Sequence, residues 1–197
     1  MSSFTMYSNE KIEKTLDLKF MTPFLRKAQK AEFKELLKII KEMNLKLKRP
    51  LKILDIGVGN GRIPLLLSKN SIWRKIDSFI GFDNSKLEIE QAKQNIKYNK
   101  VKLSYLDATQ LGQINNFITQ TRYDLIICTY FTPGNFKPDE IELRTSRKGI
   151  IVSYPQNCLK PNKKFVNIFK TAFNLLKPCG KIFLGSINID SDENRKK

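Results

Sequence analysis

From residue 51 onward, short apolar segments alternate with amphipathic ones, and this alternation constrains the fold more than any other feature of the sequence. It predicts an α/β fold: a doubly wound, Rossmann-like and mostly parallel sheet with helices on both faces and right-handed crossovers. The segment 123–130 is apolar almost throughout, which is typical of a strand buried on both faces of a parallel sheet. Predicted strands span 51–56, 78–83, 101–108, 123–130 and 181–187, and predicted helices span 60–69, 85–99, 114–119 and 163–176.

Residues 9–45 have a helical pattern in two pieces that break near Thr22-Pro23, because the residue before a proline disfavours the helical conformation. We therefore expect an N-terminal helical extension over 1–48, acting as a cap or lid, and a single domain over 49–197. A chain of 197 residues with 41% hydrophobic content can bury one substantial core. The stretch 131–162 is predicted to be irregular.

The composition excludes several kinds of chemistry. There is no histidine, so histidine-based triads, metal sites and general bases are ruled out. The three cysteines, at positions 128, 158 and 179, lie far apart and match no metal spacing, so we expect no metal site and interpret them as reduced thiols of a cytoplasmic protein. No apolar run approaches the roughly 20 residues of a membrane span, and the first residues lack the apolar core of a secretory signal.

The formal net charge of +17 has two interpretations. It can be an electrostatic footprint for RNA or DNA. It can also reflect composition alone, since lysines are spread along the whole chain and arginine, the better residue for bidentate phosphate contacts, is scarce.

Three glycines follow the first predicted strand in "ILDIGVGNGR", residues 53–62. Glycine reaches positive φ and lets main-chain N–H groups approach a ligand closely, and Asn60 can cap the helix that follows. A dinucleotide-binding fingerprint requires a small residue where this chain has Arg62, so NAD and FAD are disfavoured. A phosphate-binding P-loop is excluded because no Gly-Lys-Ser/Thr follows.

With these motifs, the chain from Leu51 onward resembles the class I S-adenosylmethionine-dependent methyltransferases. The motifs are "ILDIGVGNGR", "FIGFDNS", "LSYLDATQL", "YDLIICTY" and "FNLLKPCGKIFLGS". The resemblance implies S-adenosyl-L-methionine as cofactor, with Asp83 on the ribose hydroxyls and Asp107 near the adenine amino group. The implied cofactor-binding residues are Asp55, Gly57, Val58, Gly59, Asn60, Gly61, Arg62, Asp83, Asn84, Asp107, Ala108 and Thr129. Each carboxylate also has a structural alternative: Asp55 can accept loop amides, and Asp83 and Asp107 can cap helices.

The implied activity is in-line transfer of a methyl group, without a metal and with no catalytic residue assigned. After the fourth strand, "TPGNFKP" is similar to a loop of methyltransferases that act on amino acids and small amines, which makes Tyr130 and Asn135 substrate-binding candidates. A simple Pro-Gly-Asn turn is the alternative. We expect a small-molecule acceptor, an amine or amino acid. An RNA methyltransferase and a non-catalytic scaffold stay open, as does the oligomeric state.

Two departures from the family pattern remain. The segment between Phe136 and Phe165 is longer than usual; it is either a substrate lid, with Arg144, Arg147 and Tyr154 as contacts, or an inert insertion. The family usually continues after the fifth strand with an antiparallel hairpin, which we expect to be missing here. Either the chain is a fragment, or another chain completes the sheet, because an unprotected edge is a pairing hazard.

Overall fold

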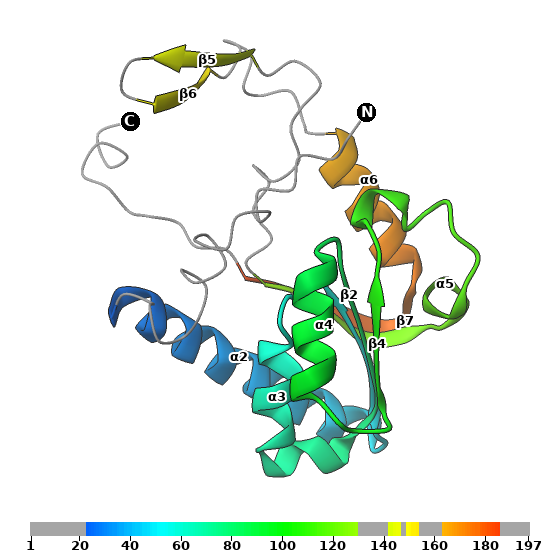
Figure 1. The fold of residues 1–197 in the computed structure, drawn as a ribbon. Helices are drawn as coiled ribbons and strands as arrows, with labels where there is room; N and C mark the ends of the chain where they lie inside the picture. Colours follow the sequence, from blue (N-terminus) through cyan, green and yellow to red (C-terminus); the bar gives the residue numbers. More distant parts are fainter. Residues whose placement is uncertain (1–22, 130–141, 147–148, 154–162, 186–197) are drawn as a thin grey trace, which may run out of the picture.

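The computed structural model describes residues 23–129, 142–146, 149–153 and 163–185 (Figure 1). Five strands form one sheet in the order β3-β2-β1-β4-β7, and every neighbouring pair is parallel. The α/β doubly wound fold expected from the alternation is therefore confirmed. The strands of this sheet are β1 (Leu51–Ile56), β2 (Ile76–Asp83), β3 (Val101–Tyr105), β4 (Tyr123–Thr129) and β7 (Leu176–Gly185).

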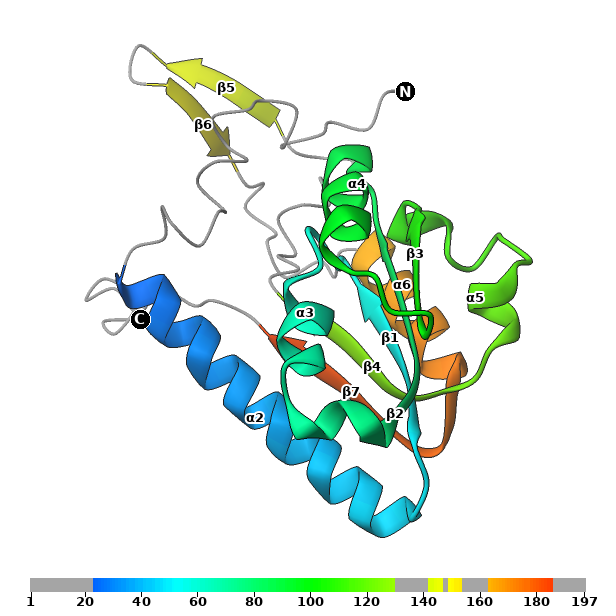
Figure 2. The same ribbon diagram turned by 60° about the horizontal axis from the view of Figure 1, so that its bottom comes forward.

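Helices cover both faces of this sheet, with α2 and α3 on one side and α5 and α6 on the other (Figures 1 and 2). The first face also receives α4 through its buried Ile89. The helices are α2 (Pro23–Leu47), α3 (Arg62–Ser68), α4 (Lys86–Asn95), α5 (Phe117–Gln120) and α6 (Lys163–Asn174), and two short 3-10 helices are η1 (Ser71–Lys75) and η2 (Ala108–Gln110).

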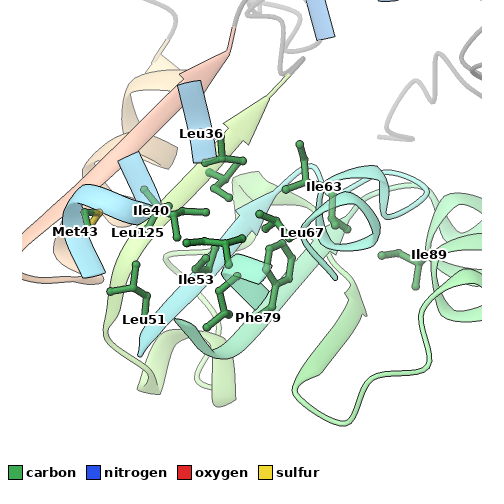
Figure 3. Packing of buried hydrophobic residues seen from close by; sticks show 14 residues of the cluster. Leu36, Ile40, Met43, Leu51, Ile53, Ile63, Leu67, Phe79, Ile89 and Leu125 are labelled. Carbon is green, nitrogen blue, oxygen red and sulfur yellow. The ribbon is translucent and has the colours of Figure 1, made fainter. Parts of the chain in front are cut away.

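Alternation along each strand divides the core into two clusters. In β4, Leu125 packs on the side of α2 and α3, while Ile126 packs on the side of α5 and α6. On the first side, α2 contributes Leu36 and Ile40, which are fully buried and point toward β1 and β4 (Figure 3). Burying one such aliphatic side chain stabilises the fold by about 1.5–3 kcal/mol before entropic costs, so α2 is held by its apolar stripe. The proposed division between 1–48 and 49–197 stays a prediction.

Several boundaries differ from the expected ones for local reasons. Helix α4 ends at Asn95 rather than 99, because Ile96 is extended, with φ −120°, and turns its side chain into the core. Strand β3 stops at Tyr105 because the chain then turns into η2, which Asp107 caps. Strand β7 begins at Leu176, earlier than expected: its register against β4 jumps from Leu176 to Lys181, so the predicted turn 177–180 lies within the strand as an irregularity.

The expectation of an irregular segment over 131–162 is wrong in one part. Strands β5 (Glu142–Ser146) and β6 (Gly149–Ser153) form a separate two-stranded antiparallel sheet, with Glu142 opposite Ser153 and Ser146 opposite Gly149. The stretch "IELRTS…GIIVS" carries β-branched and aliphatic residues on both sides of a short connection, which is the signal that could have predicted a hairpin.

A buried carboxylate fixes the edge of the sheet opposite the glycine-rich loop. Asp124 is 1% exposed and accepts two hydrogen bonds from Arg49, Nη2 at 2.6 Å and Nη1 at 3.0 Å. It also accepts the main-chain N–H of Lys52 at 2.8 Å and Lys177 Nζ at 3.1 Å. Burial would raise the pKa of Asp124, but the bonds from Arg49, Lys52 and Lys177 outweigh it and hold the pKa below its usual range. Asp124 thus joins the start of β1 to the irregular start of β7.

We expect Asp124→Asn to destabilise the protein by about 2–3 kcal/mol at neutral pH, because the change removes a buried charge from two cations that stay behind. The folded pKa is depressed, so this contribution is present above the ordinary pKa of 3.8 and is lost as pH falls through the folded value. Urea unfolding at pH 7 and near pH 3 checks this: the gap between wild type and variant should shrink at the acid end. Asp77→Asn, which alters a half-exposed carboxylate 3.9 Å from Lys52 Nζ, should change little.

Candidate functional site

The strand order places a candidate site at the carboxyl edge of the sheet. Strands β1, β2 and β3 follow one another outward in one direction, and β4 lies on the other side of β1. In an open parallel sheet, ligands bind outside the carboxyl ends of the strands at the point where the order reverses. Asp55 near the end of β1, Asp83 at the end of β2 and Thr129 at the end of β4 are therefore brought to one edge, although the sequence separates them by dozens of residues.

The glycine-rich loop leaves β1 in a conformation that requires glycine. Gly57, Gly59 and Gly61 have φ of 78°, 54° and 83°, values that residues with a Cβ rarely adopt. The N–H groups of Gly57 and Val58 both donate to the Phe82 carbonyl, at 2.9 and 3.0 Å, which ties the loop to the end of β2. Helix α3 then begins with Gly61 in the N-cap position and no side-chain cap. The expectation that Asn60 caps this helix is therefore wrong: the left-handed glycine replaces a side-chain cap.

Asp83 connects the loop to the second strand. Its Oδ2 accepts the Gly59 N–H at 2.9 Å, and its Oδ1 accepts the Ser85 N–H at 2.9 Å. Burial raises the pKa of Asp83, and the main-chain N–H groups of Ser85, Gly59 and Asn84 oppose that rise. The N-cap of α4 is Ser85, whose Oγ accepts the Glu88 N–H. Asp83 does not cap the helix itself; it orients both the loop and the residue that does.

Asp55 is 1% exposed, and neither of its carboxylate oxygens has a hydrogen-bond partner among the residues that the structure describes. Burial raises its pKa to about 8; Arg62 opposes the rise, and Asp83 and Glu32 add to it. Buried polar groups are almost always hydrogen-bonded in folded proteins, so such a carboxylate needs a donor from outside the described residues. An ammonium group has the charge and the donors that this position lacks.

We expect Asp55→Asn to raise the melting temperature of the ligand-free protein by much more at pH 9 than at pH 5. The folded pKa, about 8, lies above the ordinary 3.8, so ionisation is unfavourable in the native state and stability falls as pH rises between these values. Asparagine carries no charge and escapes this loss. Thermal unfolding at both pH values tests the prediction, with Glu90→Gln on the exposed face of α4 as control. An equal effect at both pH values would contradict it.

The remaining predicted residues lie around the same edge. Asp107 caps η2, its Oδ1 accepting both the N–H and the Oγ1–H of Thr109 at 2.8 Å. Asn84 is exposed beside Asp83, and Asn60 is half-buried in the loop. Val58, Ala108 and Thr129 are buried at 5%, 7% and 6% exposure, so only their main chains or small side chains can line a ligand site.

The candidate substrate-binding and lid residues Tyr130, Asn135, Arg147 and Tyr154 lie outside the described residues, as does Cys158. Arg144 lies in β5, where the main chain is described. Among the described residues, no cluster of three or more histidine, cysteine, aspartate or glutamate side chains could hold a metal ion. Nor does any helix in the described ranges have the length and apolar character needed to cross a membrane.

Two carboxylates that the sequence did not single out also reach this edge. Glu32 of α2 forms an ion pair with Arg62, with Nη2 2.7 Å from Oε1. Glu88 of α4 is 8% exposed, and its Oε2 lies 3.6 Å from where a Cβ would stand on Gly59. An acidic residue in the first turn of a helix is common at the surface, because its negative charge interacts favourably with the helix dipole. The sequence around Glu88 therefore does not indicate that this residue is buried. No local sequence pattern identifies Glu32 as a site residue, because its partner Arg62 lies 30 residues away in the sequence.

The family model described as a methyltransferase domain matches residues 47–196. The chain belongs to this family. The match covers every strand of the sheet and all of the predicted cofactor residues, which confirms the resemblance to the class I S-adenosylmethionine-dependent methyltransferases. No curated protein matches the chain.

Solved structures of methyltransferases also match this methyltransferase domain. One structure of the plantazolicin methyltransferase BpumL, in complex with SAH, is 19% identical over 84% of this chain and 54% of that chain, with a TM-score of 0.49. Another, with a pentazolic desmethylPZN analog and SAH, is 27% identical over 60% of this chain and 40% of that chain, with a TM-score of 0.41. A SAM-dependent methyltransferase from Geobacter sulfurreducens, in complex with S-adenosyl-L-homocysteine, is 16% identical over 75% and 47%, with a TM-score of 0.44. The chain thus spans about half the length of these proteins or less.

Proposed function

We propose that the chain binds S-adenosyl-L-methionine at the carboxyl edge of its sheet and transfers the methyl group to a small-molecule acceptor, an amine or an amino acid. The position of the Asp83 carboxylate carries this proposal. It lies at the end of β2 and bonds the Gly59 N–H, so the residue expected on the ribose is in contact with the loop expected around the rest of the cofactor. Membership of the methyltransferase domain family supports the same assignment.

The residues present fit this cofactor. Asp83 would accept the ribose hydroxyls, with a carboxylate that is only partly buried and already oriented by its bonds from Gly59 and Ser85. The buried Asp55 would take the ammonium of the amino-acid end. The three glycines leave every second position of the loop without a Cβ, and Asp107, beside the buried Ala108, would meet the adenine. Val58, Asn60, Arg62, Asn84 and Thr129 complete the proposed cofactor set, and Tyr130 and Asn135 are the proposed acceptor contacts.

When bound, S-adenosylmethionine supplies a methyl group on a sulfonium that departs as a neutral thioether, so little acid or base help is needed from the protein. In the proposed transfer, the S–CH₃ bond would break as the acceptor nitrogen bonds to the methyl carbon, the electron pair would stay on sulfur, and the amine proton would go to solvent. The task of the chain is then to hold the acceptor in line, at a distance of about 3–3.5 Å. A hydroxyl or carbon acceptor would need a general base, for which no residue is assigned.

RNA is the second candidate acceptor, favoured by the net charge of +17. An RNA acceptor predicts methyl transfer that weakens steeply as the salt concentration rises. The reason is that binding of lysine and arginine to RNA phosphates releases counterions, which added salt opposes. A small-molecule acceptor predicts transfer that is insensitive to moderate salt. We also propose a cytoplasmic location, on the composition of the chain.

Calorimetric titration of the full chain with S-adenosylmethionine and S-adenosylhomocysteine tests the cofactor assignment. Saturable binding of both compounds is expected. Heats no larger than those of titration into buffer alone would contradict the cofactor assignment. Labelled donor with a metabolite pool, and separately with RNA at low and high salt, then tests the acceptor. Label that enters only RNA would overturn the small-molecule proposal, and label that enters neither would favour a non-catalytic scaffold.

A further inference from the structure

A helix outside the strand-helix alternation reaches into the candidate site. Glu32, on α2, lies against Arg62, the first residue of α3, and both side chains are nearly buried, at 12% and 14% exposure. Glu32 also lies over the end of β7: a Cβ on Gly185 would collide with its carboxylate, and the same point is 3.2 Å from Thr129 Cγ2. Glu32 on α2 thus lies against both Arg62, at the start of α3, and the carboxyl end of β7.

Arg62 is in turn the cation whose charge acts on the buried Asp55. The positive charge of Arg62 lowers the pKa of Asp55, whereas the negative charges of Asp83 and Glu32 raise it. The charge of Asp55 in turn adds to the rise in the pKa of Cys128 on β4. Glu88 lies close by, next to Gly59. Asp83 and Glu32 thus add negative charge to the environment of Asp55, and Arg62 opposes it. The planar guanidinium of arginine presents its N–H donors in a fixed geometry. When an ion pair also fixes its position, its positive charge stays at a constant distance from Asp55.

We propose that Glu32 is a positioning residue: it holds the Arg62 guanidinium in place so that Asp55 and Arg62 together receive the amino-acid end of the methyl donor. This inference rests on the proposed function. Arg62 opposes the build-up of negative charge around Asp55, and Glu32 keeps Arg62 there. The N-terminal helix α2 would thereby act on the zwitterionic end of the cofactor rather than on the ribose that Asp83 would hold.

The test compares two ligands that differ in that end. S-adenosylhomocysteine carries the amino-acid group, and 5′-methylthioadenosine lacks it. In Glu32→Gln we expect binding of S-adenosylhomocysteine to weaken about tenfold, the loss of one charge-assisted hydrogen bond, while 5′-methylthioadenosine binds within about twofold of wild type. Glu35→Gln, an exposed carboxylate on the same helix, is the matched control and should alter neither ligand.

A double-mutant cycle with Arg62→Gln separates positioning from a general loss of order. If Glu32 acts through Arg62, the double variant should bind S-adenosylhomocysteine no more weakly than Arg62→Gln alone. Glu32→Asp, which keeps the charge but shortens the reach, provides the same comparison if Glu32→Gln does not fold, and it should show a smaller loss with the same selectivity.

Two results would overturn the inference. One is equal weakening of both ligands in Glu32→Gln, since a purely structural role would affect the nucleoside part as well. The other is unchanged affinity for S-adenosylhomocysteine. If the wild-type chain binds neither ligand, the proposed function itself fails and takes this inference with it. If the wild type binds both while the variants show no selectivity, the proposed function stands and the role of Glu32 does not.

Discussion

Asp83→Ala is expected to weaken binding of S-adenosylmethionine by about a hundredfold or more. A carboxylate that accepts two ribose hydroxyls makes two charge-assisted hydrogen bonds, each contributing about 1.5–3 kcal/mol. The change also frees the Gly59 and Ser85 N–H groups, which Asp83 holds at 2.9 Å. The glycine-rich loop would then lose its tie to β2 at that point. Calorimetric titration of variant and wild type under one set of conditions measures the effect.

Asp77→Ala is the matched control for this experiment. Asp77 lies on the same strand, β2, but half-exposed and near the opposite end, so its loss removes one negative charge without touching the loop. Binding by Asp77→Ala should stay within about twofold of wild type. Unchanged affinity in Asp83→Ala would remove the ribose assignment and, with it, the central support for the cofactor proposal. Asp83→Asn should fall between the two, because an amide keeps the shape and one acceptor but not the charge.

Gly61→Ala is expected to destabilise the fold by about 2–5 kcal/mol, which combines a left-handed backbone cost of about 1–2 kcal/mol with an overpacking cost of about 1–3 kcal/mol. Gly61 has φ +83°, and a Cβ there would collide with Ile96 Cδ1 and stand 3.2 Å from Ala92 Cβ. Ala92 lies in the last turn of α4 and Ile96 follows that helix directly, and both are buried near the start of α3. Urea unfolding at pH 7 measures the loss directly.

Gly59→Ala separates the two costs. Gly59 also has positive φ, +54°, but the nearest atom to its added Cβ is Glu88 Oε2 at 3.6 Å, an ordinary contact. We therefore expect this variant to lose only the conformational part, about 1–2 kcal/mol. Equal losses in Gly59→Ala and Gly61→Ala would show that the packing of α3 on α4 contributes nothing to the requirement for glycine at position 61.

The residues that sequence reasoning found share one property: each belongs to a contiguous motif. Asp55 and Asp83 end apolar runs, and Gly57 to Gly61 interrupt one, so strand periodicity and glycine spacing locate them. Two predictions from local patterns were wrong, the helix cap at Asn60 and the irregular segment that contains β5 and β6. Asn60 has the side chain of a good cap, but the helix begins one residue later, at a left-handed glycine. The β5-β6 hairpin was likewise missed because the segment around it is rich in turn residues.

The order of the elements and the nature of the loop were determined by the sequence alone, because both depend on local preferences: periodicity of two or 3.6, and the freedom of glycine to adopt positive φ. The pairing of strands that are distant in the sequence and the charges around Asp55 were decided only by the tertiary structure. Glu32 and Arg62 meet because α2 buries Leu36 and Ile40 against the sheet, and that packing carries a carboxylate to the loop. Contacts between side chains that are distant in the sequence cannot be predicted from residue spacing. Hydrophobic burial determines where a helix packs, and it does not depend on which polar residues the helix carries.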